Sequence, residues 1–360
     1  MLTIKKHGII LTILVKRLTK ILMHITIKDV AKKAKVSTAT VSLVVNNNPR
    51  IPQDTKRRVQ KIIKELGYQP SRSARDLVSR KSGNIGFILT EDHFLKTEPF
   101  YTKIFLGTEF EARKHPYYVL LSMISTDYKV EDPLPRFIPE RSVDGIIIAG
   151  KVPDELISNL SKHPYPIVYV DYYPDKGDHA AVLIDNLNGG IIATQHLIDC
   201  GRRNIAFIGG DIQHPSIRDR FLGYKTVLER NKIKYSDDRV IISDKTISQE
   251  SGYFCAKKIL KSKTTINAIF ACNDAMAIGA LQCFRENKIQ VPNDISIVGF
   301  DDIQMDQMVD PPITTIHVSK EDMGSEAIRL ISEILSSKVP KIRKILMPVT
   351  LVERQSTCSL

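Results

Sequence analysis

Three polar residues directly follow short apolar segments, at positions suited to hold a small polar molecule: Asp171, Asn273 and Asp301. Such segments predict buried parallel strands, and the ligands of parallel sheets bind beyond the carboxyl ends of the strands. Arg220, at the predicted start of a helix, adds a guanidinium group. Two carboxylates, an amide and an arginine fork can hold adjacent hydroxyl groups in fixed geometry, which is the chemistry that a sugar requires.

Two aromatic residues, Phe100 and Tyr101, open the first predicted helix of the same region and are suited to stack on the apolar face of a ring. A nucleobase is the less favoured ligand because the chain has no Trp, although these two residues keep it open. Structural alternatives exist for the polar residues. Asn273 suits a helix cap, Asp301 a turn, and Arg220 a salt bridge.

A second group of small side chains suits DNA recognition: Ser37, Thr38, Ala39 and Thr40, with Leu43 one turn later. They begin the second of three short helical patterns. In a helix-turn-helix, the N-terminal residues of the second helix contact base edges in the major groove. Leu43 is suited to touch a thymine methyl group, and the alternative is a core leucine.

The three helical patterns that position these residues lie between residues 24 and 68. Thr26 with Asp29 resembles a capping box, and Ser37 suits the cap of the second helix. Pro52 suits the first turn of the third helix and Gly67 its end. The apolar faces have helical spacing: Ile27, Val30, Ala31 and Ala34; Val41, Val44 and Val45; Val59, Ile62, Ile63 and Leu66. The tight break between the first two helices favours a helix-turn-helix over a generic three-helix bundle.

Beyond residue 82 the pattern changes to short β-branched segments that alternate with helical ones. The predicted strands are 85–89, 118–121, 145–149, 167–170, 181–184, 205–208, 240–242, 268–271, 296–298 and 314–316. The clearest predicted helices are 101–114, 189–200, 220–231, 275–287 and 321–336. Repeated βα units predict an α/β fold with parallel sheets, and this many strands favours two lobes with a cleft between them.

The charge is unevenly distributed. The chain carries a net charge of +12, and residues 24–82 hold 14 Lys and Arg against four Asp and Glu. The first 23 residues add five basic residues and no acidic one, which leaves −3 for residues 83–360. A basic head on a mildly acidic body indicates that the head meets a polyanion such as DNA.

Cysteine usage and the N-terminal segment favour a cytoplasmic protein. The five cysteines are scattered, without a C-x-x-C pair, so we expect reduced thiols and neither a metal nor a cofactor. Residues 1–23 lack a small-residue cleavage site, and their apolar run is too short to cross a bilayer. We interpret them as a basic extension, or as a mis-called start with initiation at Met23.

Several linked motifs together resemble the lactose-repressor/galactose-repressor (LacI/GalR) family of bacterial regulators. The head supplies ITIKDVAKKAKVSTATVSLVVNN (25–47) and LGYQPSRSARDL (66–77). The body supplies GRRNIAFIGG (201–210), RFLGY (220–224), CND (272–274), VPNDISIVGFDD (291–302) and TTIHVSKEDMG (314–324), together with Asp185, Asn186, Gly189 and Gly190. The resemblance extends from residue 24 to the C-terminus. It implies a homodimer, sometimes a tetramer, with a body folded like periplasmic sugar-binding proteins.

The resemblance also implies roles for individual residues. Thr38, Ala39 and Leu43 match base-reading positions, although many relatives carry arginine or histidine in place of this leucine. Residues 69–82 match a hinge with a short helix that orders on the operator, where Ala74 and Leu77 lie in the minor groove and the leucine is wedged between base steps. The effector positions of sugar-responsive relatives are matched by Asp171, Arg220, Asn273 and Asp301.

We therefore predict a helix-turn-helix domain at 24–68, a hinge at 69–82 and a two-lobed effector-binding and dimerisation domain at 83–360. The expected function is a sequence-specific repressor whose operator affinity is set by a small molecule, with a sugar as the favoured effector. An enzyme is disfavoured because no nucleotide, nucleophile-elbow or HExxH motif occurs. A transport binding protein would need an export signal in place of a DNA-binding head.

Overall fold

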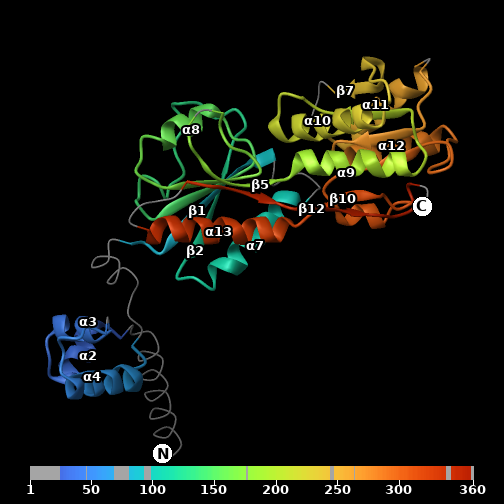
Figure 1. Cartoon of the computed structure of the whole chain (residues 1–360). Helices are drawn as coiled ribbons and strands as arrows, with labels where there is room; N and C mark the ends of the chain where they lie inside the picture. Colours follow the sequence, from blue (N-terminus) through green and yellow to red (C-terminus); the bar gives the residue numbers. More distant parts are fainter. Residues whose placement is uncertain are drawn as a thin grey trace, which may run out of the picture. The chain divides into compact units, whose positions relative to one another are not determined.

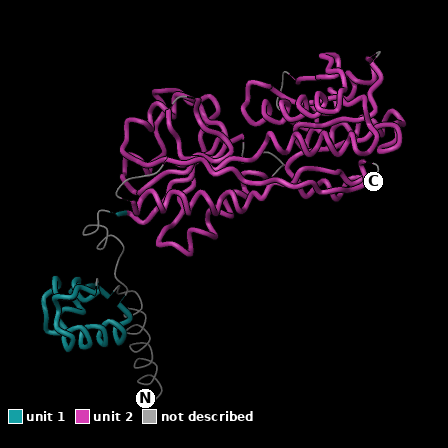
Figure 2. The backbone as a smooth tube through the Cα atoms, viewed as in Figure 1, with its two compact units in different colours: residues 1–81 teal, residues 82–360 magenta. Residues whose placement is uncertain are grey.

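The computed structural model describes residues 25–45, 47–68, 81–92, 99–175, 177–243, 247–262, 264–337 and 342–357. The chain forms two compact units, residues 1–81 and residues 82–360 (Figure 2). The predicted extension at 1–23 and nearly all of the predicted hinge, with Ala74 and Leu77, lie outside the described residues.

The head contains three helices: α2 (Ile27–Ala34), α3 (Thr38–Val45) and α4 (Gln53–Leu66), labelled in Figure 1. Their apolar faces meet in one small core that includes Val30, Val41, Val44, Val59 and Ile62. The Asp29 carboxylate accepts hydrogen bonds from the Thr26 backbone N–H at 2.8 Å and from its hydroxyl at 2.6 Å. Gly67 ends α4 with a φ of +65°, a conformation that glycine adopts without strain. The predicted helices and their order are therefore confirmed.

The first lobe of the body is built on a six-stranded parallel sheet with the order β11-β5-β4-β3-β1-β2. Helix α8 (Asp154–Leu160) covers one face, and α7 (Phe100–Ala112) and α13 (Lys320–Ser336) lie on the opposite face (Figure 1). The strands are β1 (Asn84–Thr90), β2 (Tyr118–Ile124), β3 (Gly145–Ala149), β4 (Ile167–Val170), β5 (Ala180–Ile184) and β11 (Lys344–Met347).

The second lobe is built on a four-stranded parallel sheet with the order β7-β6-β8-β9. Its strands are β6 (Ile205–Gly209), β7 (Val240–Ile242), β8 (Ala268–Ala271) and β9 (Ser296–Val298). The helices around it are α9 (Asn186–Asp199), α10 (Pro215–Arg230), α11 (Gln249–Lys261) and α12 (Asp274–Glu286). Short helices η1 (Asp237–Arg239) and η2 (Gln304–Gln307) complete it. The chain passes between the lobes after β5, after β10 (Thr315–Val318) and after β11.

Several predicted bounds differ from the structure, and two strands were not predicted. Helix α10 begins at Pro215, so Arg220 lies in its second turn and does not head it. Strand β10 begins one residue later than predicted, at Thr315. Strands β11 and β12 (Val349–Val352) were missed: β11 pairs with β5 and β12 pairs antiparallel with β10. Both strands are four residues long and partly exposed, so they lack the apolar pattern of a buried strand. Their extended conformation depends on pairing with strands that are distant in the sequence.

Within the described residues, no helix is long and apolar enough to cross a membrane. The same residues contain no group of three or more His, Cys, Asp or Glu side chains placed to hold a metal ion.

Candidate functional site

The turn between α2 and α3 fixes the start of the recognition helix. Lys35 ends α2 in the left-handed conformation, with a φ of +51°. The Ser37 hydroxyl accepts a hydrogen bond from the Thr40 backbone N–H at 3.0 Å and lies 2.9 Å from the Thr40 hydroxyl. Ser37 is thus the cap of α3, as its position predicts. These two hydroxyls bond to each other and hold the helix end that presents Thr38 and Ala39.

The exposed face of α3 carries the residues expected to meet DNA. Thr38 and Ala39 are exposed. Leu43 is 38% exposed, whereas its neighbours on the inward face, Val41 and Val44, are 0% and 2% exposed. The alternative that Leu43 is a core residue is therefore wrong, because the core is filled without it.

Exposed basic side chains lie on the two helices that pack against α3. Lys28, Lys32, Arg57 and Arg58 are exposed on α2 and α4. Lys33 differs, because its ammonium group pairs with Glu65 of α4 at 2.9 Å. Exposed lysines and arginines on the helices next to a recognition helix are suited to contact phosphates, which position a protein on DNA without reading its sequence.

In the body, one cavity of about 490 Å³ collects every residue proposed for the effector. Six of its lining residues are those expected from the sequence: Phe100, Tyr101, Asp171, Arg220, Asn273 and Asp301. The remaining ones were not anticipated: Thr90, Asp92, Thr126, Lys151, Val152, Pro153, Asp211, His214, Ser216, Ile217 and Ile247. Several of these also follow strand ends, namely those of β1, β2, β3 and β6. The strand-end rule that selected Asp171 would have found them if applied to every strand.

Asp171 lies directly after β4 in a left-handed conformation, with a φ of +64°. Its Oδ2 accepts a hydrogen bond from the Tyr101 hydroxyl at 2.9 Å, while its buried Oδ1 has no hydrogen-bond partner among the described residues. Burial raises the pKa of Asp171 to about 6, although Arg220 and the tyrosine act in the opposite direction. Non-glycine residues in this region of φ are strained and cluster at binding sites.

Arg220 is 6% exposed and is held by the protein on several sides. Its Nε donates to Asn186 Oδ1 at 2.8 Å, and its Nη1 donates to the Cys272 carbonyl at 2.5 Å. The guanidinium carbon lies 3.6 Å from the centroid of the Phe300 ring. These contacts fix the plane of the guanidinium group. They also give a structural role to Asn186, one of the residues that carry the family resemblance in the sequence.

Two glycines allow α10, the helix that carries Arg220, to pack closely against α9. A Cβ atom on Gly190 of α9 would lie 2.3 Å from the Arg220 carbonyl oxygen, a distance that real Cβ contacts do not reach. Gly223 of α10 faces α9 in the same way, with the Leu187 carbonyl oxygen 2.5 Å from a Cβ built on it. Close approach of α9 and α10 therefore requires glycine at both positions, and it sets the depth of the guanidinium in the cavity.

Asp301 follows the end of β9 with a φ of +113° and is 8% exposed. Its Oδ1 lies 3.6 Å from Arg220 Nη2, beyond hydrogen-bond distance, and has no hydrogen-bond partner in the described part of the chain. Burial raises the pKa of this carboxyl group against the opposing charges of Arg220 and Lys320. Asp301 is thus a buried, strained carboxylate in the cavity wall, and not merely a turn residue.

Asn273 caps a helix and also lies in the cavity lining. Its Oδ1 accepts a hydrogen bond from the Met276 backbone N–H at 3.0 Å, which caps α12, and it also lines the cavity. Its neighbour Asp274 is fully buried and accepts a hydrogen bond from the Thr315 hydroxyl at 2.6 Å. Asp274 does not line the cavity, so its role is structural.

Lys320 is a buried lysine that does not line the cavity. Its ammonium group donates to the carbonyl oxygens of Val318 at 3.0 Å, of Asp302 at 3.4 Å and of Asp301. It also lies 5.6 Å from the centroid of the Phe100 ring. Lys320 therefore ties the start of α13 to the segment after β9.

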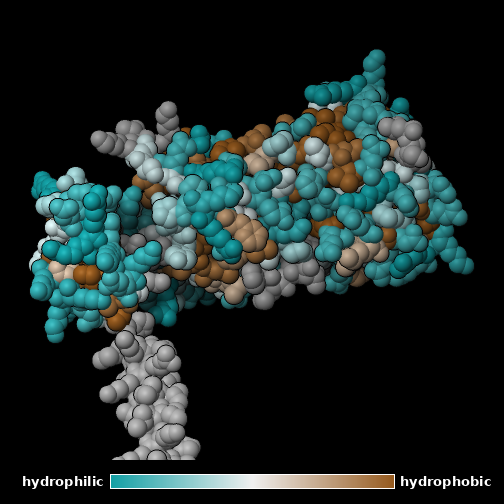
Figure 3. Space-filling model, turned by 90° about the horizontal axis from the view of Figure 1, so that it is seen from below, coloured by the Kyte–Doolittle hydropathy of each residue, from teal (hydrophilic) through white to brown (hydrophobic). Residues whose placement is uncertain are grey.

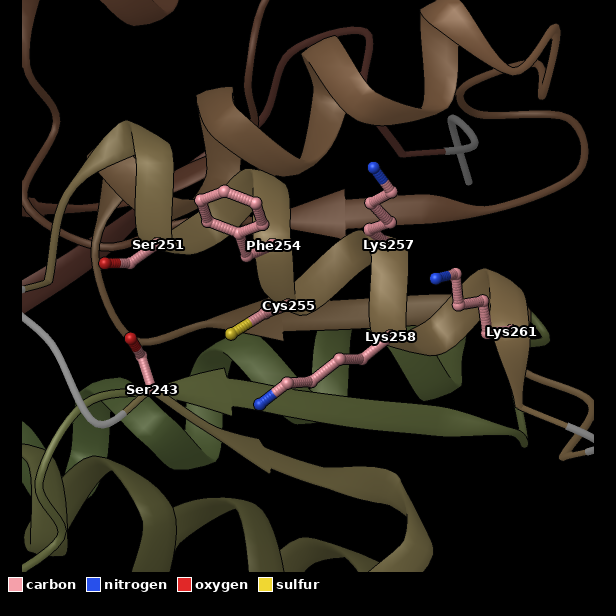
Figure 4. A pocket seen from close by; sticks show the side chains of 7 residues that line it. All are labelled: Ser243, Ser251, Phe254, Cys255, Lys257, Lys258 and Lys261. Atoms are coloured by element: carbon pink, nitrogen blue, oxygen red, sulfur yellow. The ribbon is translucent and has the colours of Figure 1, made fainter.

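A second cavity, of about 480 Å³, lies along α11 near the end of β7 and contains none of the predicted effector residues. Figure 4 shows its lining: Ser243, Ser251, Phe254, Cys255, Lys257, Lys258 and Lys261. The three lysines are exposed. Exposed lysines on one helix are typical of a solvated face, so the first cavity is the better effector site.

Comparisons with known proteins agree with both parts of the chain. Residues 26–71 match the bacterial regulatory proteins of the lacI family, and residues 194–357 match the periplasmic binding protein-like domain. The chain is 35% identical to the HTH-type transcriptional repressor PurR of Pasteurella multocida (strain Pm70) over 340 residues, which cover 93% of this chain and 99% of the relative.

Two solved structures share the fold. One is the lac repressor dimer bound to operator and the anti-inducer ONPF, with a TM-score of 0.77, 26% identity and coverage of 94% and 100% of the two chains. The other is the complex of the transcriptional regulator CelR with cellobiose, with a TM-score of 0.70, 28% identity and coverage of 92% and 99%. The chain therefore belongs to the lacI family of bacterial regulatory proteins, which are DNA-binding regulators controlled by small-molecule effectors and not enzymes.

Proposed function

We propose that this protein is a transcriptional repressor that binds a near-palindromic operator as a homodimer. Its affinity for the operator would fall or rise when a sugar binds in the body cavity. Ser37, Thr38, Ala39, Thr40 and Leu43 would lie in the major groove. Their support is the exposed start of α3, held in place by the Ser37 cap and flanked by exposed lysines and arginines. A regulator that binds chromosomal DNA works in the cytoplasm.

The hinge is proposed from the resemblance alone, because Ala74 and Leu77 lie outside the described residues. Leu77 would be wedged between central base steps, where unstacking is offset by contacts that the bend permits. Leu77→Ala should weaken operator binding by about 1–3 kcal/mol, the scale of one specific contact, and leave effector affinity unchanged. Equal operator titrations for the two proteins would reduce Leu77 to an ordinary linker residue.

The observation that carries the sugar assignment is the convergence of Asp171, Arg220, Asn273 and Asp301 in one cavity. Adjacent hydroxyls of a sugar each donate and accept, so carboxylates, an amide and a guanidinium satisfy them in pairs. The cavity volume of about 490 Å³ suits a ligand of this size, and apolar side chains such as Phe100 and Ile217 complete the wall. A structural relative is solved in complex with cellobiose.

Dimerisation is supported by apolar surface on the first lobe. Phe110 of α7 is 53% exposed and Tyr118 of β2 is 63% exposed, with Leu106 and Met123 also exposed on these elements. Figure 3, which views the body from the side of α7, shows hydrophobic surface among hydrophilic residues. Exposed apolar side chains gathered on two neighbouring elements are suited to a protein interface, and an operator with two half-sites needs two heads.

Two measurements test the proposal. Full-length protein should shift a near-palindromic duplex with an affinity that falls steeply with salt, because bound lysines and arginines release counterions. A body fragment starting at Gly83 that still shifted this duplex would contradict the assignment of DNA binding to the head. Calorimetry with a panel of sugars should find a ligand, whereas a purine ligand with no sugar ligand would overturn the sugar assignment.

A further inference from the structure

The effector cavity has an excess of negative charge among its described lining residues. Two basic side chains, Lys151 and Arg220, stand against four carboxylates: Asp92, Asp171, Asp211 and Asp301. His214 adds no positive charge at neutral pH. Burial, together with the charges of Arg220 and Lys151, lowers the pKa of this histidine to about 4.

The guanidinium group of Arg220, the buried positive charge in the cavity wall, is partly bound by the protein itself. Two of the nitrogens of Arg220 donate to Asn186 and to the Cys272 carbonyl, and the third lies 3.6 Å from an Asp301 oxygen. Lys151 is exposed to solvent. A phosphate group needs several convergent donors, as a bidentate arginine or a free helix N-terminus supplies. Helix α10, whose first turn lines the cavity, begins with Pro215, which removes one backbone N–H from this helix start.

Hydrogen-bond acceptors, in contrast, are left open. The Oδ1 atoms of Asp171 and Asp301 are buried and receive no hydrogen bond within the described residues. A buried carboxylate oxygen without a donor is costly, so the ligand gains most by presenting N–H or O–H groups to both. The same atoms would repel a phosphate or carboxylate placed against them.

We propose that the cavity selects effectors that carry no negative charge and present donors to both open carboxylate oxygens, so that an uncharged sugar or amino sugar binds and its phosphate ester is excluded. The inference rests on the proposed function in placing the effector in this cavity. It concerns charge, and it holds equally for a nucleobase and its nucleotide.

The test is calorimetry at pH 7.5 on full-length protein with matched probes. The probes are glucose, glucosamine and glucose 6-phosphate; cellobiose and its 6-phosphate; and hypoxanthine and inosine 5′-monophosphate. Within the set that binds, the phosphorylated member should bind at least ~30-fold more weakly than the uncharged member, since its charge meets an unbalanced negative cavity. Glucosamine should bind at least as tightly as glucose if glucose binds.

Charge variants at the cavity locate the effect. Asp92 and Asp211 are exposed members of the lining, and Asp211 Oδ1 accepts a hydrogen bond from the Gln213 backbone N–H that asparagine can also accept. Asp92→Asn and Asp211→Asn should each reduce the discrimination by about threefold, the effect expected of one screened charge. Asp238→Asn, an exposed aspartate of η1 outside the cavity, is the matched control and should leave it unchanged.

Each outcome decides one of the two proposals. A phosphorylated probe that binds as tightly as its uncharged partner overturns the charge inference and leaves the sugar assignment standing. Hypoxanthine binding with exclusion of its nucleotide overturns the sugar assignment and supports the charge inference. If no uncharged or amine-bearing probe binds, both the sugar assignment and the charge inference are contradicted. If Asp238→Asn reduces the discrimination as much as the two cavity variants do, the discrimination does not arise from the charges of the cavity.

Discussion

The head and the body place their recognition residues in opposite environments. In the head, Thr38, Ala39 and Leu43 are exposed on one helix, and the core beneath them is complete without them. In the body, Arg220, Asn273 and Asp301 are buried, and the first two are hydrogen-bonded to other parts of the fold. Binding and stability are therefore separable in the head and linked in the body.

The difference follows from the ligand. DNA is a large polyanion that meets a surface, so contacts and counterion release suffice without burying the protein's own polar groups. A small molecule must be surrounded, so its partners are removed from water before it arrives. Two of those partners, Asp171 and Asp301, also adopt positive φ values, whereas the positive φ values of the described head residues lie in its turns, as at Lys35 and Gly67.

The largest expected effect is that of Arg220→Ala. Removing the guanidinium leaves Lys320 as the remaining positive charge opposed to the buried Asp301. The body should therefore lose about 3 kcal/mol of unfolding free energy, the lower end of the cost of breaking a buried ion pair, and effector affinity should fall by more than ~100-fold. Urea unfolding and calorimetry measure the two effects. Operator affinity without effector should not change, because the head is a separate unit.

Arg218→Ala is the matched control, since Arg218 lies on the same helix with its side chain 57% exposed. It should alter neither effector affinity nor stability by more than about 0.5 kcal/mol. An effector response that Arg220→Ala leaves unchanged would contradict the view that binding and stability are linked in the body, because this buried charge of the cavity would then play no part in binding.

Asp171→Asn should move stability and binding in opposite directions. The pKa of Asp171 is about 6 in the folded protein against an ordinary value of 3.8, so the folded state favours its protonated form. This unfavourable contribution is absent below the unfolded pKa, grows as the pH rises from the unfolded pKa to about 6, and levels off at roughly 3 kcal/mol above that pH. The variant should therefore be more stable than the wild type at pH 7.5, with a gap that closes towards pH 4.

The same variant should lose effector affinity, because asparagine presents an amide where the ligand meets a carboxylate. Urea unfolding without effector at pH 4, 6 and 7.5, together with calorimetry at pH 7.5, measures both effects. A variant that is less stable at every pH would show that the hydrogen bond from Tyr101 outweighs the burial of the charge.

The smallest expected effect is that of Leu43→Ala on the head. Because the side chain is exposed, the unfolding free energy should change by less than about 0.5 kcal/mol, while operator affinity falls by about 1–2 kcal/mol. Val44→Ala is the matched control: its side chain is 2% exposed, so it should destabilise the head by roughly 1–3 kcal/mol. Anisotropy titrations and thermal unfolding compare the two. Equal losses of stability would show that recognition and folding are linked in the head as well.

Local patterns were sufficient for most of the fold. Strands such as β3 and β8 are continuous apolar segments, and their bounds match the prediction because a buried parallel strand needs apolar side chains on both faces. The helix ends at Thr26, Ser37 and Gly67 could also be predicted from the sequence, since each cap depends on residues only a few positions away. The strand-end rule brought the effector candidates together for the same reason: the carboxyl ends of parallel strands share one edge of a sheet.

By itself, the sequence determined the order of elements, the two-part organisation, the family and the six residues that meet in the cavity. Only the tertiary structure decided that Leu43 is exposed, that Arg220 lies within its helix and is held by Asn186 and Cys272, and that β11 and β12 are strands. It also decided which buried carboxylate oxygens of the described residues receive no hydrogen bond. The physical reason is range: propensity and capping act between neighbours in sequence, whereas burial, strand pairing and the balance of charge depend on groups that only the fold brings together.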